Sequence, residues 1–197
     1  MDEAPGWDAI EGARASAHPG VEPYHVAVGN GLAFGSPLQG ISAYGLSDHW
    51  HLITYGLTEL WAKEGDDARL SGWGYELTMR VRRDPGGGLP PDWAFNLLVG
   101  IAKVTWERSV VFGEGHRLQP RGLITGSRDS QLTALAFTQD PEVGSIATPN
   151  GSVAFLQVVG ITEEELARMK ATSTAEVLAR LAMENPLLVT DPARSST

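Results

Sequence analysis

The sequence predicts an α+β fold, in which a mixed, largely antiparallel sheet carries helices packed on it. The segment Trp73–Val81 alternates apolar residues with small or polar ones, as expected of a strand with one packed face. The segment Val153–Val159 is apolar on both faces except for Gln157, which indicates a central strand covered on both sides. Two segments that begin like capped helices follow it, so strands come both before and after helices.

The N-terminal half begins with a short helix. Residues Trp7–Ala17 form this predicted helix, which stops at His18-Pro19-Gly20. We expect short strands at Tyr24–Val28 and Ile41–Tyr44. In the next strand, His49–Tyr55, the odd positions share one face and the even positions share the other.

The middle of the chain combines the clearest strand with the longest helix. In Trp73–Val81 the odd positions are apolar, and we expect the even positions, Glu76 among them, on a wetter face. The helix is predicted over Asp92–Phe112, where Asp92 can cap the start and Gly113 can end it.

The C-terminal third returns to the sheet and then adds two helices. The pairs Thr162 with Glu165 and Ser173 with Glu176 are spaced as capping boxes, and each predicts the start of a helix. The expected strands here are Leu132–Phe137, Ser152–Gly160 and a last strand at Leu187–Thr190.

Length and composition indicate one globular domain. The chain has 197 residues, and we assign residues 6–191 to a single domain with 1–5 and 192–197 as frayed ends. The net charge of −9 argues against nucleic acid and against an anionic membrane surface, whereas a basic protein would be attracted. With no cysteine, thiolate metal sites and cysteine nucleophiles are excluded, and we expect no cofactor. The N-terminus does not resemble a signal peptide, so a cytoplasmic location is expected.

The pair His49 and His51 is the sharpest candidate for chemistry. Two imidazoles two residues apart on a strand point to one face, a spacing that metal sites use, and a metal-dependent hydrolase centred on this pair is the alternative function. A third ligand would have to come from Asp48, Glu59 or His116. The other interpretation is that both histidines bond to neighbouring backbone or carboxylates.

Other polar groups favour structural roles. Glu59 and Glu76 have no spacing that requires an acid–base pair, and the basic run Arg80–Arg83 is interpreted as a solvated strand end. The sequence has six tryptophans, a residue enriched in binding hot spots. We place Trp73 in the core, and four others are candidates for a contact surface: Trp50, Trp61, Trp93 and Trp106.

A set of short phrases, taken in order, is similar to one known family. The phrases are Gly6-Trp7-Asp8-Ala9-Ile10, His49-Trp50-His51, Thr54–Leu60, Ser71–Thr78, Pro90–Ala94, Thr138–Pro141, Thr148–Gly151, Phe155–Gly160 and Leu188–Asp191. This order and spacing resembles the N-terminal domain of Suppressor of fused, from about Gly6 to Asp191.

The resemblance implies a protein-interaction domain without catalytic activity. Eukaryotic members clamp a peptide of a transcription factor between two domains, whereas this chain resembles a stand-alone, bacterial-type member. Such relatives are associated with toxin systems as immunity proteins, so the resemblance implies a protein partner such as a toxin. A Tyr and an Asp that hold the peptide in eukaryotic members fall near Val104 and His116, and neither identity is kept.

The expected contact surface therefore follows the long helix and the loop Gly113–Gly126, because binding residues often lie on loops held by a rigid scaffold. The predicted partner-binding residues are Val104, Arg108, Glu114, His116 and Arg117. A structural or oligomerisation module is a third interpretation of the chain.

Overall fold

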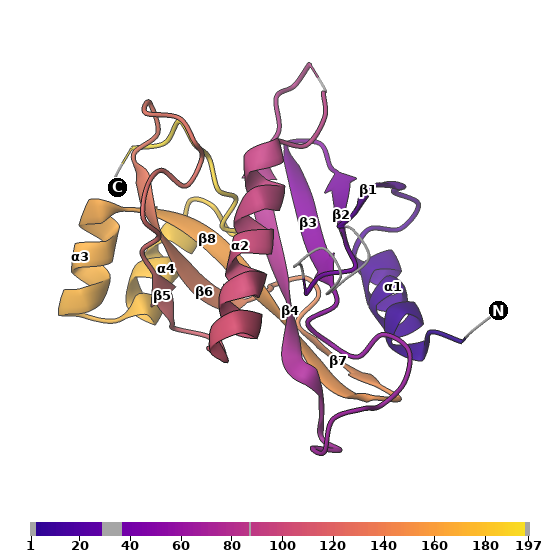
Figure 1. Cartoon of the computed structure of the whole chain (residues 1–197). Helices are drawn as coiled ribbons and strands as arrows, with labels where there is room; N and C mark the ends of the chain where they lie inside the picture. The colour runs from indigo at the N-terminus through magenta and orange to yellow at the C-terminus, as the bar shows by residue number, and fades with distance from the viewer. Residues whose placement is uncertain (1–2, 29–36, 87, 196–197) are drawn as a thin grey trace.

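The computed structural model describes residues 3–28, 37–86 and 88–195. Within these residues the strands form one eight-stranded sheet in the order β1-β2-β3-β4-β8-β6-β5, and β7 pairs separately with β8 (Figure 1). The β4–β8 pair is parallel, and all other pairs are antiparallel. The strands are β1 Pro23–Ala27, β2 Gly40–Gly45, β3 His49–Tyr55, β4 Leu70–Arg82, β5 Arg117–Leu118, β6 Leu132–Gln139, β7 Ser145–Thr148 and β8 Gly151–Thr162. The predicted α+β fold with a mixed sheet is confirmed.

Helices cover both faces of the sheet. The helices are α1 Pro5–Ala17, α2 Asp92–Arg108, α3 Glu163–Ala171 and α4 Thr174–Ala182. Helix α2 packs on one face, where its Leu98 and Ile101 join Leu52 and Leu77 in the largest apolar cluster. The opposite face carries two smaller clusters, one beneath α1 and one beneath α3 and α4. The sheet is therefore the middle layer of three (Figure 1).

The strongest sequence patterns predict the right elements. Strand β8 lies between β4 and β6, and its residues Phe155 and Leu156 are buried in clusters on opposite faces. At the start of α3, the hydroxyl of Thr162 accepts from the N–H of Glu165, whose carboxylate accepts from the N–H of Thr162. At α4, Ser173 Oγ accepts from the N–H of Glu176. The predicted helix starts are confirmed.

Two predicted elements differ from the structure, and two short strands were not predicted. Helix α2 ends at Arg108 rather than Phe112, because Ser109 takes a left-handed backbone with φ 52°. The last strand at Leu187–Thr190 is reduced to a single bridge between Val81 and Thr190, because Leu188 is left-handed with φ 49°. The strands β5 and β7 were not predicted, since they contain only two and four residues.

Both described ends of the chain belong to the folded domain. Residues 1–2 and 196–197 of the ends expected to be frayed lie outside the described residues, whereas Pro5 opens α1. Arg194 donates two hydrogen bonds to the buried Glu165 carboxylate, at 2.5 and 2.7 Å, and one to the Gly160 carbonyl. Among the described residues, no helix is long and apolar enough to cross a membrane.

Candidate functional site

A fully buried ion pair lies at the centre of the face that α1, α3 and α4 cover. Arg80 of β4 donates to both carboxylate oxygens of Asp140, at 2.7 and 3.0 Å, and both side chains are 0% exposed. Arg80 also donates to Gln157 of β8 at 2.5 Å and to Glu142 at 2.7 Å. The pair thus ties β4, β8 and the loop after β6 to one point. The interpretation of Arg80 as part of a solvated strand end is wrong.

Asp140 is surrounded by donors. Besides Arg80, the hydroxyl of Thr78 donates to it at 2.7 Å, and the backbone N–H groups of Glu142 and Val143 donate at 2.9 and 3.0 Å. Burial alone would raise the pKa of Asp140, but the donors around it, led by His51 and Arg80, hold that pKa far below its usual range. Asp140 is therefore a carboxylate at neutral pH.

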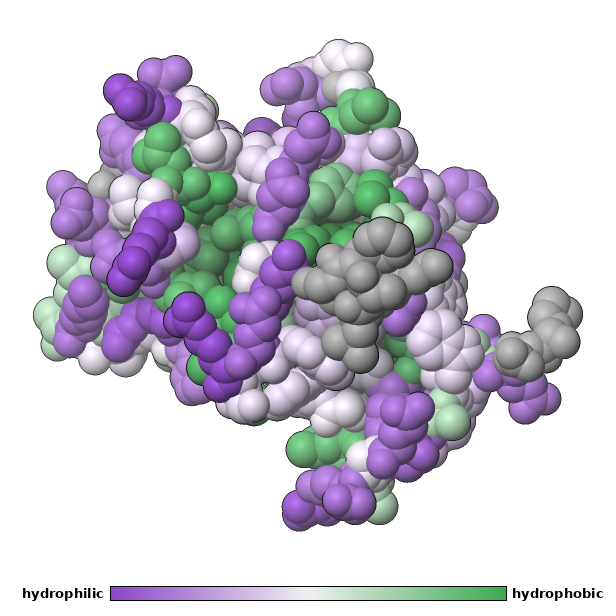
Figure 2. All heavy atoms as spheres, viewed as in Figure 1, coloured by the Kyte–Doolittle hydropathy of each residue, from purple (hydrophilic) through white to green (hydrophobic). Residues whose placement is uncertain are grey.

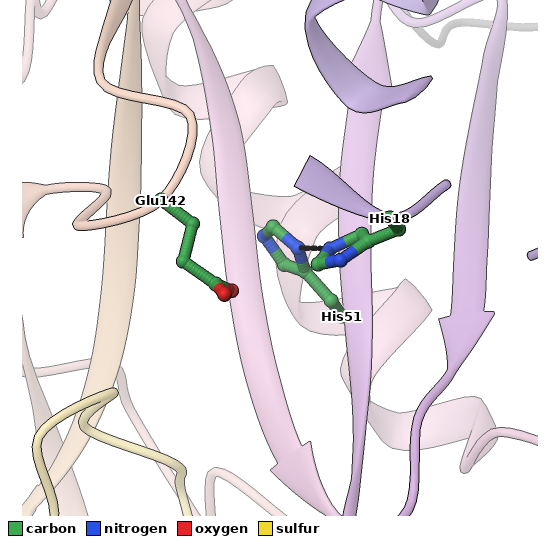
Figure 3. A group of neighbouring side chains, drawn as sticks. All are labelled: His18, His51 and Glu142. Carbon is green, nitrogen blue, oxygen red and sulfur yellow. Dashed lines mark hydrogen bonds between the residues drawn. The ribbon is translucent and has the colours of Figure 1, made fainter. Parts of the chain in front are cut away.

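Two buried histidines extend this network towards α1. His51 lies 3.0 Å from Asp140 through Nε2, and His18 Nε2 lies 2.6 Å from His51 Nδ1 (Figure 3). Burial lowers the pKa of His51 to about 4 and outweighs the opposing effect of Asp140; burial also lowers the pKa of His18. With both rings neutral, His51 donates through Nε2 to the carboxylate and accepts at Nδ1 from His18. The two neutral imidazoles thus connect α1 to Asp140 through hydrogen bonds, not through charge.

His18, His51 and Glu142 are the one group of potential metal ligands that the described residues bring together, with their ligand atoms within 4.8 Å of one another. Two nitrogen ligands of a tetrahedral zinc ion, each about 2.05 Å from the metal, lie about 3.3 Å apart. The His18–His51 separation of 2.6 Å is instead that of a hydrogen bond. The Glu142 carboxylate, which lies apart from the rings in Figure 3, bonds to Arg80. The two histidines bond to each other and Glu142 bonds to Arg80, so a cation among them would lie beside the buried guanidinium.

The predicted pair His49 and His51 does not converge on one point. His49 bonds through Nδ1 to Asp48 at 2.8 Å, whereas His51 bonds to Asp140 and His18. The other two suggested ligands have partners elsewhere: Glu59 accepts from Lys63, and His116 Nδ1 accepts from the N–H of Gly113. The interpretation that the histidines bond to neighbouring carboxylates is confirmed.

Glu76 is buried rather than solvated, so the expectation of a wetter face is wrong there. Its carboxylate accepts from the N–H of Gly56 and from the N–H and hydroxyl of Thr58, at 2.9, 2.9 and 2.7 Å, and from Thr54 at 2.6 Å. Burial raises the pKa of Glu76, and these hydrogen bonds oppose that rise. Glu76 fixes the backbone that follows β3 and has no open side for a substrate.

The five residues predicted to bind a partner lie at the end of α2, in the loop that follows and, for Arg117, at the start of β5. Arg108, Glu114, His116 and Arg117 are exposed, whereas Val104 is half-buried against the main core. Arg117 donates to the Met169 carbonyl of α3 at 2.5 Å. On this face, hydrophilic residues follow α2 and hydrophobic residues show on both sides of it (Figure 2).

This loop is held firmly against the sheet. The N–H of Gly115 donates to the Phe137 carbonyl at 2.9 Å, and the N–H of Phe137 donates to the His116 carbonyl at 3.0 Å. The Phe112 ring stacks on Phe137 with centroids 4.6 Å apart. Next to it, Val111 is 52% exposed and borders a hollow of about 290 Å³. The sequence pattern does not predict this apolar rim, because it continues the helix to Phe112.

The sequence and the fold agree with one protein family. The sequence model of the Suppressor of fused protein family matches residues 35–195. The chain belongs to the Suppressor of fused family. It is 32% identical over 162 residues to the human Suppressor of fused homolog, covering 77% of this chain and 33% of that protein. The chain therefore spans about a third of the length of this curated relative.

Solved structures of the family have the same fold. A chain of the Sufu–Fu complex crystal structure superposes with a TM-score of 0.90 at 28% identity, covering 99% of this chain and 93% of that one. A SUFU homologue from Neisseria gonorrhoeae superposes with a TM-score of 0.67 at 13% identity, covering 97% and 96% of the two chains. At that identity the likeness concerns the fold alone.

Proposed function

We propose that this protein is a non-enzymatic binding domain that holds a protein partner. The observation that carries the proposal is the match over 99% of the chain to a chain of the Sufu–Fu complex crystal structure. That relative assembles with another protein, and this chain shares its fold and 28% of its sequence. In a bacterial host, the proposed partner is a toxin that the domain neutralises, or a regulator that it restrains.

The proposed contact surface is the end of α2 with the loop after it. Its predicted residues are Val104, Arg108, Glu114, His116 and Arg117, and the exposed apolar residues Val110 and Val111 adjoin them. A rigid loop loses little conformational entropy on binding, and the bonds to Phe137 supply that rigidity. Charged side chains around exposed apolar ones form the usual composition of a binding surface.

A metal-dependent hydrolase centred on His49 and His51 has less support. His51 uses both ring nitrogens within a buried network, and His49 bonds to Asp48. A hydrolytic site needs an open coordination position that substrate can reach. His51 is 0% exposed, so substrate has no access to it.

A pull-down from the native host tests the proposal. The tagged protein is compared with a double variant, Arg108→Glu with His116→Glu, and with the control Ala15→Glu on the exposed side of α1. We expect one stoichiometric partner with the wild type and the control, a loss of at least tenfold with the double variant, and weaker capture at high salt. Equal capture by all three proteins would refute the placement. If no partner is found, and chelator lowers both the stability and a hydrolytic activity, the hydrolase is correct instead.

A further inference from the structure

A hollow of about 550 Å³ opens between α2 and the segment that follows β3. We call it the tryptophan hollow, because Trp61, Trp73 and Trp106 line it. Trp61 is 47% exposed and Trp106 is 43% exposed, which is unusual for the largest apolar side chain. Trp73 meets Trp106 edge to face, with ring centroids 6.4 Å apart. Aromatic surface is therefore available to a ligand here.

The walls of the tryptophan hollow are fixed from behind. The buried Glu76 carboxylate holds the backbone of Gly56 and Thr58, as described above. The Asn150 side chain donates to the Glu59 carbonyl at 2.8 Å, and the N–H of Gly6 donates to the Leu60 carbonyl at 2.9 Å. The hollow is preformed, so a ligand does not have to order it.

The polar groups at the hollow favour a positive charge. Burial alone would raise the pKa of Glu59, but hydrogen bonds from Lys63 and from the N–H groups of Gly65 and Glu64 lower it to about 2. Glu59 is therefore ionised, with its charge balanced by Lys63 at 2.8 Å. Glu64 also lines the hollow, and its carboxylate forms no ion pair with any basic side chain in the described part of the chain. The residues that line the hollow therefore include one acidic residue, Glu64, whose charge no described basic side chain balances, together with the exposed Trp61 and Trp106.

We propose that the tryptophan hollow binds the guanidinium group of an arginine side chain presented by a protein partner. A cation is attracted to the face of an indole ring, and a planar guanidinium also stacks on it. Glu64 supplies the opposite charge, and the net charge of −9 attracts a basic partner at longer range. This inference rests on the proposed binding function and adds the chemistry of one contact.

The experiment uses a probe with a single arginine. N-acetyl-Gly-Arg-Gly-amide is titrated into the ¹⁵N-labelled protein, and the indole N–H signals are followed by NMR. The control peptide carries citrulline, which has the shape of arginine without its charge. We expect saturable shifts of the Trp61 and Trp106 signals, with binding at least tenfold weaker for citrulline and for the Trp106→Ala variant.

A matched variant controls for unspecific loss of aromatic surface. Tyr24 is 43% exposed on β1, outside the lining of the hollow, and Tyr24→Ala is expected to bind the arginine peptide as the wild type does. Equal binding of arginine and citrulline would overturn the proposal in favour of an apolar ligand. Shifts confined to other tryptophans would overturn it as well.

Capture of the host partner separates the two proposals. If Trp106→Ala and Glu64→Lys capture the partner as the wild type does, and the arginine peptide leaves the Trp61 and Trp106 signals in place, the inference on the hollow fails while the binding function stands. If both variants reduce capture at least tenfold and Tyr24→Ala does not, the hollow contributes to the binding site. If no partner is captured under any condition, the proposed function fails, and the peptide titration alone decides whether the hollow binds a cation.

Discussion

Replacement of Asp140 by asparagine should be among the most damaging single changes in the domain. The substitution keeps the shape of the side chain but removes its charge, so the fully buried Arg80 keeps only Glu142, which is 33% exposed, as a charged partner. The asparagine side chain also has only one oxygen to accept hydrogen bonds. Its NH₂ group therefore has to face donors that now bond to a carboxylate oxygen, among them His51 and Thr78. Breaking one side of a buried ion pair costs about 3–5 kcal/mol. We expect Asp140→Asn to lower the free energy of unfolding by about that amount.

Urea unfolding followed by tryptophan fluorescence measures this loss. With a slope of about 2.5 kcal/mol per molar urea, the midpoint should fall by about 1–2 M. The control is Asp67→Asn, which removes an ion pair to Arg69 on an exposed loop and should leave the midpoint unchanged. If Asp140→Asn shifts the midpoint no more than Asp67→Asn does, the central ion pair does not stabilise the fold.

Three further predictions concern stability. Between pH 6.5 and pH 4 the wild type should lose about 3 kcal/mol more than His51→Gln, because burial holds the pKa of His51 at about 4. Gly72→Ala should destabilise the domain by about 1–3 kcal/mol, because φ is +53° and a Cβ would lie 2.7 Å from a backbone oxygen. Gly100→Ala, in open space on α2, should instead stabilise it by about 0.5–1 kcal/mol. Ser173→Ala should cost about 1 kcal/mol through the lost N-cap of α4, whereas Ser16→Ala, inside α1, should cost nothing measurable.

The sign of the pH effect follows from proton binding. Between pH 6.5 and 4 the unfolded chain protonates His51 while the folded chain does not, so stability falls as the pH falls. Glu76, whose pKa burial raises, acts in the opposite direction above pH 4.5 but is present in both proteins and cancels in the comparison. Urea titrations at several pH values measure the difference. Parallel pH profiles of wild type and His51→Gln would contradict the low pKa of His51. Equal unfolding midpoints for Gly72→Ala and Gly100→Ala would contradict the prediction on the glycines, and equal midpoints for Ser173→Ala and Ser16→Ala would contradict the prediction on the N-cap.

The sequence predicts the fold through patterns that are local. The odd positions of β4, from Tyr75 to Val81, are apolar and lie in one cluster, as alternation requires. The same alternation places Glu76 and Arg80 on a wetter face, and that is wrong because this face is buried too. Their partners come from distant parts of the chain, Asp140 among them, and periodicity carries no information on such pairing.

The buried hydrogen-bond network around Arg80 and Asp140 could not be predicted from local sequence patterns either. His51 was singled out by its spacing from His49, but its partners His18 and Asp140 are 33 and 89 residues away in sequence. The loop after α2 follows from Gly113, which ends the predicted helix, whereas the apolar rim does not, because a left-handed Ser109 gives no sequence signal of its own. The partner-binding role of Arg108 and its neighbours stays a prediction.

Photo-cross-linking in the native host tests the binding account most directly. A photoreactive amino acid is placed at Arg108, at His116 and, as the control, at Ala15 on α1, which packs on the opposite face of the sheet. The account predicts one cross-linked protein at the first two positions, in competition with unlabelled wild type, and no product at Ala15. A product at Ala15 alone would contradict the proposed surface, and the absence of a product at all three positions would contradict the binding function.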